Sequence, residues 1–285
     1  MNLRKFAVGL SALFLFSGVA DARGLLSYLA LPIEQELYGG SISSGDALAL
    51  YSKQQQQQTF DACADRFPAS RPFDLSRVQG SMRPLALCSD SFAVLYSQTT
   101  KTPLVVVERL TASTIKSAKG GERTNVFFPD PRIPKNGRAE LSDYKGSSLD
   151  RGHQSPAGDA ASPNAMAQSF ALSNMVPQDA TNNRKIWSRV EGDVRKFVQR
   201  ADGDVFVFTG PIFDDGHRTI GANRVWVPTR LFKLVYDEKS QRAWAYILPN
   251  AETRIEKPVD YDTFVKQTGL HLLSNLPISG SISRY

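Results

Sequence analysis

The chain has 285 residues and a formal net charge of +6, with 41% hydrophobic and 22% charged residues. This balance predicts a folded core and excludes an intrinsically disordered protein. Only two cysteines and three histidines occur, which excludes zinc fingers and disulfide-dense scaffolds. The one long apolar run lies at the N-terminus, so a protein with several membrane spans is excluded as well.

The N-terminus has the pattern of a secretory signal peptide over residues 1–22. Arg4 and Lys5 precede an apolar core at residues 6–19, and residues 20–22 form an Ala-x-Ala cleavage site. An apolar run of about 14 residues is shorter than the ~20 residues that cross a membrane, which favours cleavage over an uncleaved anchor. We therefore expect a secreted or periplasmic protein that has no membrane span after signal cleavage.

The two cysteines, Cys63 and Cys88, are expected to form a structural disulfide. An oxidising compartment favours joining them, and a loop of this size stabilises a protein by roughly 3–4 kcal/mol in the chain-entropy model. The alternative is a catalytic pair of a cysteine and a histidine. Neither cysteine lies in a motif that supports such a pair, so the disulfide is favoured.

The chain is expected to alternate short strands and polar connections after an irregular or weakly helical lead-in at residues 23–60. Residues 117–148 hold most of a long polar connection that contains several glycines and prolines, which is typical of a binding loop. From residue 85 onward, apolar runs of strand length are bounded by turn residues. Strands are predicted over residues 92–96, 103–108, 170–174, 205–209, 225–227, 232–236 and 243–248.

One strong helix is predicted between about residues 181 and 200. Ile186, Val190 and Val194 recur at helical spacing, and on this wheel Asn183 lies near the middle of the apolar side. A short amide that is buried without a partner costs about 1–3 kcal/mol. We therefore expect Asn183 to have a functional role.

The densest group of reactive side chains follows the long polar connection and includes Arg151 and His153. A histidine can act as a general base near neutral pH, and a guanidinium offers paired donors to a phosphate. The neutral amide of Asn183 is an acceptable oxygen ligand for Mg²⁺, which keeps most of its waters. Together these groups suit phosphodiester hydrolysis, in which the histidine activates water, the metal neutralises the leaving oxygen and the arginine stabilises charge on phosphorus.

Two separated motifs resemble the signature of the non-specific DNA/RNA endonuclease family, which includes the endonuclease G type. They are Asp-Arg-Gly-His at residues 150–153, and Asn174-x-x-Pro177-Gln178 with Asn183 and Trp187-x-x-x-Glu191. Content, order and spacing agree, and the resemblance covers about residues 85–250. It implies an α+β fold with a central antiparallel sheet and a ββα-metal (His-Me finger) site. We expect a nuclease domain at residues 81–285 and an N-terminal extension of unknown role at residues 23–80.

The resemblance implies a base and a metal ligand. His153 matches the general base, Asn183 the sole protein ligand of a hydrated Mg²⁺ or Mn²⁺, and Glu191 the residue that holds metal-bound waters. The spacing supports the last role independently, because Asn183 and Glu191 lie two helical turns apart, too far for both to bind one metal directly. Helical side chains lean toward the N-terminus, so Glu191 would reach a metal-bound water instead.

The resemblance also implies residues that contact the substrate or support the base. Arg151 and, by a looser alignment, Arg123 match arginines that contact the phosphates. Asn174 would help to orient His153. Asp150 is interpreted as structural, because a carboxylate beside the substrate phosphate would repel it.

These observations predict an exported, Mg²⁺-dependent endonuclease that hydrolyses DNA and RNA with little sequence specificity. The basic charge suits a polyanionic substrate, and a water nucleophile needs no ribose 2′-hydroxyl. Two alternatives remain: a non-catalytic secreted nucleic-acid-binding protein on the same fold, and a toxin-like effector nuclease. The joint presence of His153, Asn183 and Glu191 argues against the first alternative.

Overall fold

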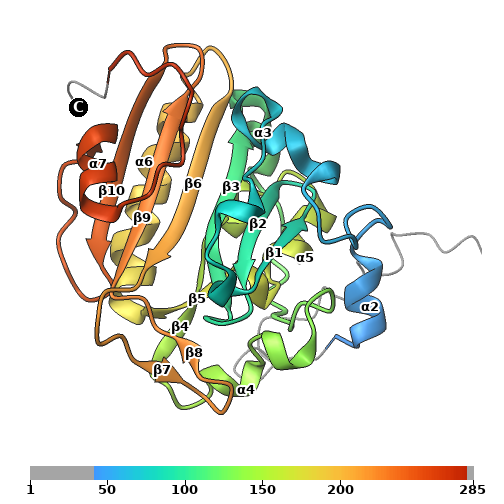
Figure 1. Ribbon diagram of the computed structural model, residues 1–285. Coiled ribbons are helices and arrows are strands. Elements are labelled where there is room, and N and C mark those ends of the chain that lie inside the picture. Colours follow the sequence, from blue (N-terminus) through green and yellow to red (C-terminus); the bar gives the residue numbers. More distant parts are fainter. Residues whose placement is uncertain (1–41, 281–285) are drawn as a thin grey trace, which may run out of the picture.

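A seven-stranded antiparallel sheet forms the centre of the protein in a computed structural model that describes residues 42–280 (Figure 1). The predicted signal peptide lies outside the described residues. The strand order is β1-β2-β3-β6-β9-β10-β11. The bounds are β1 Pro84–Cys88, β2 Phe92–Ser97, β3 Thr102–Leu110, β6 Val205–Ile212, β9 Arg230–Asp237, β10 Arg242–Pro249 and β11 Val259–Asp260. The predicted α+β fold with a central antiparallel sheet is confirmed.

The remaining elements are two small antiparallel sheets and a set of short helices. The small sheets pair β4 (Leu149–His153) with β5 (Met175–Asp179), and β7 (Thr219–Ile220) with β8 (Val225–Trp226). The helices are α2 Ser44–Ala49, α3 Ala112–Ala118, α4 Leu141–Tyr144, α5 Pro163–Ser169, the π-helix η9 Asn182–Trp187, α6 Ser188–Val198 and α7 Tyr261–Thr268. Short 3-10 helices lie at Asp61–Arg66, Pro68–Ser70, Leu75–Arg77, Gly80–Met82, Lys135–Gly137, Ala157–Asp159 and Leu172–Asn174. Among residues 42–280, no helix combines the length and apolar character that crossing a membrane requires.

Helices and turns cover both faces of the central sheet, because side chains alternate along each strand. In Figure 1, α6 lies behind the sheet and α7 lies in front of it. Val190, Val194 and Val198 of α6 are buried in one cluster with side chains of β6, β9 and β10. Phe264 of α7 and Phe67 pack against the opposite face. Burial of each such side chain contributes about 1.5–3 kcal/mol.

The strands predicted from the sequence are confirmed, except the one at residues 170–174, which is wrong. Phe170 caps the end of α5, and the next residues form the 3-10 turn that leads into β5. Ser162 caps α5 through its Oγ, which accepts a hydrogen bond from the amide of Ala165, and Pro163 occupies the first helical turn. In an apolar run this short, the spacing of the apolar residues does not distinguish a strand from a helix end or a turn. The helix-start signals at Ser162 and Pro163 indicate a helix before this run, and the strand prediction did not use them.

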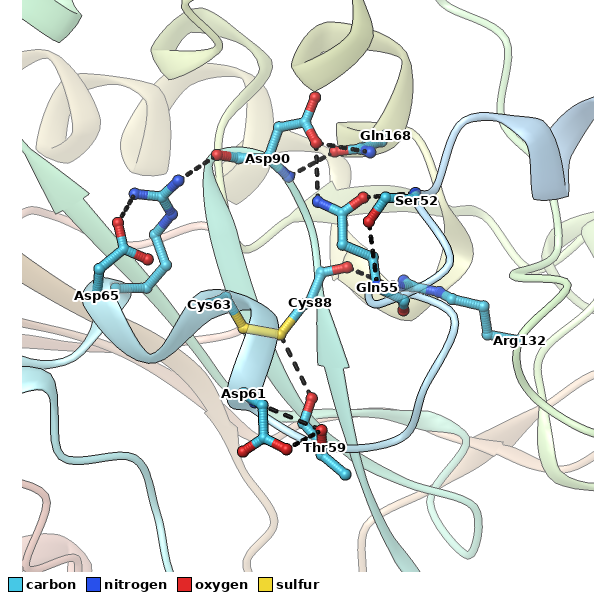
Figure 2. Close-up of a disulfide and its surroundings, with 11 residues drawn as sticks. Ser52, Gln55, Thr59, Asp61, Cys63, Asp65, Cys88, Asp90, Arg132 and Gln168 are labelled. Carbon is cyan, nitrogen blue, oxygen red and sulfur yellow. Dashed lines mark hydrogen bonds and ion pairs between the residues drawn. A yellow bond between two sulfur atoms is a disulfide. The ribbon is translucent and has the colours of Figure 1, made fainter.

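The predicted disulfide between Cys63 and Cys88 is confirmed (Figure 2). Cys63 lies in the 3-10 turn after the N-terminal segment, and Cys88 ends β1. Both cysteines and the nearby Phe60 and Phe67 belong to one buried cluster under the central sheet. The disulfide therefore attaches the segment before β1 to the edge of the sheet.

Replacing both cysteines with serine should lower the free energy of unfolding by roughly 3 kcal/mol, because the 25-residue loop is no longer closed in the unfolded chain. Urea unfolding followed by circular dichroism measures the effect. Reduced wild-type protein is the matched control and should unfold at the same denaturant concentration as the double variant. Equal unfolding midpoints for the oxidised and reduced wild-type protein would show that the disulfide contributes no stability.

Candidate active site

A cavity of about 1060 Å³ lies where β4 meets the η9–α6 helix, and five of the predicted site residues line it. These residues are Arg123, Arg151, His153, Asn183 and Glu191. The sixth, Asn174, is fully buried beneath the lining. Segments that are far apart in the sequence thus bring the predicted residues to one cavity.

The pair of strands and the helix that follows them form a compact ββα unit. Gly152 lies opposite Val176 in the β4–β5 ladder, and a Cβ at this glycine would lie only 2.0 Å from Oε1 of Gln178. Only glycine therefore fits at position 152 without displacing Gln178. The Nε2 of Gln178 in turn donates to Oδ1 of Asn182 at 2.7 Å, which ties β5 to the start of the helix.

His153 ends β4 and is 8% exposed. Its ring packs edge-on against Phe170 with 4.9 Å between centroids, and it lies 5.7 Å from Phe127. Burial, together with the positive charges of Arg123 and Arg151, lowers the pKa of His153 to about 3. The imidazole is therefore neutral at pH 7 and has a lone pair for a proton, although a pKa this low also weakens it as a base.

Two arginines surround the histidine and give the cavity a positive field. The guanidinium of Arg151 lies 4.1 Å from the ring centroid of Phe127, and that of Arg123 lies 5.0 Å from the ring centroid of Phe170. Flat contact with an aromatic face holds each guanidinium beside the imidazole. Both side chains line the cavity, where a phosphate could meet them.

Asn174 supports the backbone that follows the histidine and does not touch the imidazole. Its Oδ1 accepts a hydrogen bond from the amide of Ser155, and its Nδ2 donates to the carbonyl of the same residue, both at 2.9 Å. A third bond runs from Nδ2 to the carbonyl of Ser169. The amide of Asn174 thus fixes the chain two residues after His153.

Asn183 reaches the cavity with its amide already oriented. Its Nδ2 donates to Oδ2 of Asp150 at 2.9 Å, so Oδ1 is the atom left to serve as an oxygen ligand. Arg184 donates to both carboxylate oxygens of Asp150, at 2.8 and 2.6 Å. Asp150 therefore orients other side chains and is paired with an arginine, although it also lines the cavity, so its structural role stays a prediction. Arg184 was missed, because no local pattern links it to a partner 34 positions away.

The helix that carries Asn183 departs from the predicted α-helix. It begins as a π-helix, Asn182–Trp187, in which more residues fill each turn than in an α-helix. The inward amide is consequently Asn182, which is fully buried and bonded to the carbonyls of Pro249 and Ala251. The placement of Asn183 in the middle of the buried face was therefore wrong, and this residue lines the cavity instead.

Glu191 lies further along the same helix, with 14% of its side chain exposed. Burial raises the pKa of Glu191 to about 7, although Lys233 and Arg195 oppose the rise. Arg195 lies 3.9 Å from the Glu191 carboxylate and donates to Asp159 at 2.9 Å. Arg195 was also missed, although its (i, i+4) spacing from Glu191 could have indicated the pair.

The oxygen atoms that could bind a metal in the cavity suit a hydrated divalent ion. Within residues 42–280, no group of three or more His, Cys, Asp or Glu side chains is arranged to hold a metal. A site built from several charged ligands is therefore not found in this part of the chain. The oriented amide oxygen of Asn183 and the carboxylate of Glu191 on the same helix suit an ion that keeps most of its waters, as Mg²⁺ does.

Several curated proteins that are similar in sequence are nucleases. Nuclease C1 of Cunninghamella echinulata var. echinulata is 36% identical over 210 residues, which make up 67% of this chain and 83% of that protein. Nuclease 1, mitochondrial, of Schizosaccharomyces pombe is 34% identical and covers 64% of both chains. Nuclease EXOG, mitochondrial, of Homo sapiens is 35% identical over 58% of this chain, which spans only 49% of that protein.

These relatives correct the predicted localisation. Besides the fission yeast and human proteins, the relatives from Danio rerio and Saccharomyces cerevisiae carry names that describe them as mitochondrial. The prediction of a secreted or periplasmic protein is therefore wrong. Mitochondrial targeting segments are also basic and poor in acidic residues. Arg4 and Lys5, in a stretch whose first acidic residue is Asp21, therefore do not by themselves indicate export.

The fold and the sequence profile point to one family. The crystal structure of an EndoG/EndoGI complex matches with a TM-score of 0.62 and 25% identity, over 70% of this chain and 91% of that one. The profile of the DNA/RNA non-specific endonucleases matches residues 72–279. The ββα unit with His153, Asn183 and Glu191 around one cavity agrees with both findings. The chain belongs to the DNA/RNA non-specific endonuclease family and is an enzyme that hydrolyses nucleic acids.

Proposed function

We propose that the chain is a Mg²⁺-dependent endonuclease that hydrolyses phosphodiester bonds of DNA and RNA with little sequence specificity, and that His153 is its general base. The observation that carries the proposal is the neutral imidazole of His153 in a cavity that Arg123, Arg151 and Asn183 also line. A base must be unprotonated at working pH, and a phosphodiester needs positive charge around it.

Each side chain has one task in this mechanism. An imidazole nitrogen of His153 takes a proton from the attacking water, while Arg151 and Arg123 bind phosphate oxygens and stabilise the charge that develops on phosphorus. Asn174 keeps the chain after the histidine in place through Ser155. Oδ1 of Asn183 would hold the hydrated ion and Glu191 its waters. When bound, the ion would neutralise the negative charge that develops on the leaving oxygen.

The proposed substrates follow from the same geometry. Arg123 and Arg151 present guanidinium groups to the cavity, and guanidinium groups contact phosphates, which all nucleic acids share. Water as the nucleophile requires no 2′-hydroxyl, so DNA and RNA are both expected to be cleaved. The non-catalytic alternative is disfavoured, because it needs neither a neutral histidine nor an oriented amide in the cavity.

Purified protein should linearise and then degrade supercoiled plasmid and should degrade structured RNA in Mg²⁺, and a molar excess of EDTA should stop both reactions. Appearance of linear plasmid before short fragments identifies endonucleolytic attack. Re-addition of Mg²⁺ after EDTA is the control that separates metal removal from inactivation. Full cleavage in EDTA would contradict the metal-dependent mechanism, and intact RNA beside degraded DNA would contradict the proposed substrate range.

A further inference from the structure

We infer that the buried ion pair of Asp130 and Arg132 is a positioning unit for His153, and that the segment at residues 50–58 holds this pair in place. The segment precedes the part of the chain that matches the family profile, residues 72–279. The inference rests on the proposed function in that His153 is taken as the catalytic base. It gives a role to residues before β1 for which the sequence indicated none.

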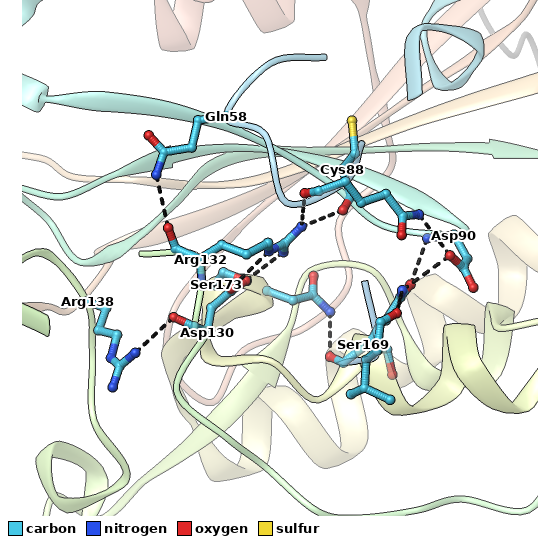
Figure 3. A network of polar contacts seen from close by, with 12 residues as sticks. Gln58, Cys88, Asp90, Asp130, Arg132, Arg138, Ser169 and Ser173 are labelled. Carbon is cyan, nitrogen blue, oxygen red and sulfur yellow. Dashed lines mark hydrogen bonds and ion pairs between the residues drawn. The ribbon is translucent and has the colours of Figure 1, made fainter. Parts of the chain in front are cut away.

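The ion pair is fully enclosed and bidentate. The side chains of Asp130 and Arg132 are each 1% exposed, and Nε and Nη2 of the arginine donate to the two carboxylate oxygens at 2.9 and 2.6 Å (Figure 3). A buried charge pair is tolerated only when further hydrogen bonds satisfy the remaining donors and acceptors. Those further bonds run in two directions, toward the N-terminal segment at residues 50–58 and toward the 3-10 turn Leu172–Asn174 before β5, here called the catalytic loop.

The N-terminal segment and β1 hold the arginine. Nη1 of Arg132 donates to the carbonyl of Cys88 and, at 3.3 Å, to the carbonyl of Gln55. The guanidinium lies 3.7 Å from the ring centroid of Tyr51, and Nε2 of Gln58 donates to the backbone carbonyl of Arg132 at 3.0 Å. Figures 2 and 3 show this arginine beside Cys88 at the end of β1, and Figure 2 also shows the disulfide. Two residues of one short segment thus contact the guanidinium, and a third binds the backbone of the same arginine.

The aspartate connects the pair to the catalytic loop. Its Oδ2 accepts a hydrogen bond of 2.6 Å from the hydroxyl of Ser173 (Figure 3). The next residue, Asn174, binds both backbone groups of Ser155 and thereby fixes the chain two positions after His153. A displacement of Asp130 would therefore reach the imidazole through two hydrogen-bonded contacts, Asp130 to Ser173 and Asn174 to Ser155, and the short stretches of chain that join them.

A second connection reinforces the first. Phe128, two residues before Asp130, accepts from the amide of Leu172 at 2.8 Å and donates to the carbonyl of Phe170 at 3.3 Å. The ring of Phe170 packs edge-on against His153. Leu50 and Tyr51 belong to the same buried cluster as these two phenylalanines. The N-terminal segment therefore supports both the ring and the backbone that surround the base.

The hydrogen bond from Ser173 to Asp130 can be removed while the ion pair of Asp130 and Arg132 is kept. Replacing Ser173 with alanine should lower kcat about tenfold and leave KM within about twofold, because a displaced base slows the chemical step more than binding. Ser169→Ala is the matched control. Both serines are 1% exposed, but the hydroxyl of Ser169 bonds only to the carbonyl of Met166 within its own helix. This control should keep the wild-type kcat.

A spectroscopic measurement separates positioning from general stability. The chain has only three histidines, so long-range ¹H–¹⁵N correlation spectra give three imidazole patterns, and His153→Ala assigns one of them. The His153 signals should shift in Ser173→Ala and stay at their wild-type positions in Ser169→Ala. Tyr51→Leu, which removes the aromatic face from Arg132, should shift them as well. Tyr51→Phe keeps the ring and should leave them unchanged.

Wild-type kcat and unshifted His153 signals in folded Ser173→Ala protein would overturn the inference. Unshifted signals in Tyr51→Leu would overturn the part assigned to the N-terminal segment. A failure of the proposed function looks different: His153→Ala would remain active, while the His153 signals would still respond to Ser173→Ala. That result would support the positioning of the histidine and reject its role as the base.

Discussion

Replacing His153 with alanine is expected to lower the turnover number by about two to four orders of magnitude, which is the range that removal of a general base produces. The imidazole is the proposed general base, and it is neutral at pH 7, since burial and two neighbouring arginines lower its pKa to about 3. The effect should appear in kcat, because the lost proton transfer belongs to the chemical step. Initial rates of plasmid nicking at saturating Mg²⁺ measure it.

Affinity for DNA provides the control for this variant. With Mg²⁺ removed by EDTA, His153→Ala and the wild-type protein should bind a short duplex with the same Kd, because the variant keeps Arg123 and Arg151, the proposed phosphate contacts. His271→Ala, at an exposed histidine outside the cavity, should match the wild type in both assays. Wild-type nicking by His153→Ala would reject the mechanism.

Replacing Asn183 with alanine is expected to abolish cleavage at low Mg²⁺ and to permit partial cleavage at high Mg²⁺. A single uncharged ligand binds the ion weakly, so the substrate phosphate and the ion's own waters supply much of the remaining binding. The fold should persist, because the tie between the helix and β5 is made by Asn182 and Gln178. Titration of plasmid cleavage against Mg²⁺ checks the result, with circular dichroism as the control for folding.

Asn183→Asp tests the ligand more sharply. A carboxylate at this position adds charge and should tighten Mg²⁺ binding measured by calorimetry, while it should slow cleavage by repelling the substrate phosphate. In the wild type, the Asn183 amide donates to Asp150, so the variant also places two acceptors together. The double variant Asn183→Asp with Asp150→Asn restores one hydrogen-bond donor and one acceptor between positions 150 and 183. It therefore controls for the repulsion between the two carboxylates of the single variant. Unchanged Mg²⁺ affinity in both variants would show that Asn183 is not the ligand.

The sequence alone determined features that depend on local pattern. Six of the seven predicted strands form, because alternating apolar residues between turns specify a half-buried or buried strand. The motif at residues 150–153 and the spacing of Asn183 and Glu191 predicted one cavity, since strands and a helix in close succession must pack together. The disulfide was predicted from the two cysteines and an oxidising export compartment, and it forms although that localisation is wrong.

Other features depend on contacts between distant residues, and only the tertiary structure decided them. The π-helix moved the buried amide from Asn183 to Asn182, because hydrogen bonds to the carbonyls of Pro249 and Ala251 determine which side chain points inward. The low pKa of His153 arises from burial and from Arg123, which lies 30 positions earlier in the chain. No short-range pattern encodes desolvation or a partner that distant, so the chemistry of the base emerges only in the folded chain.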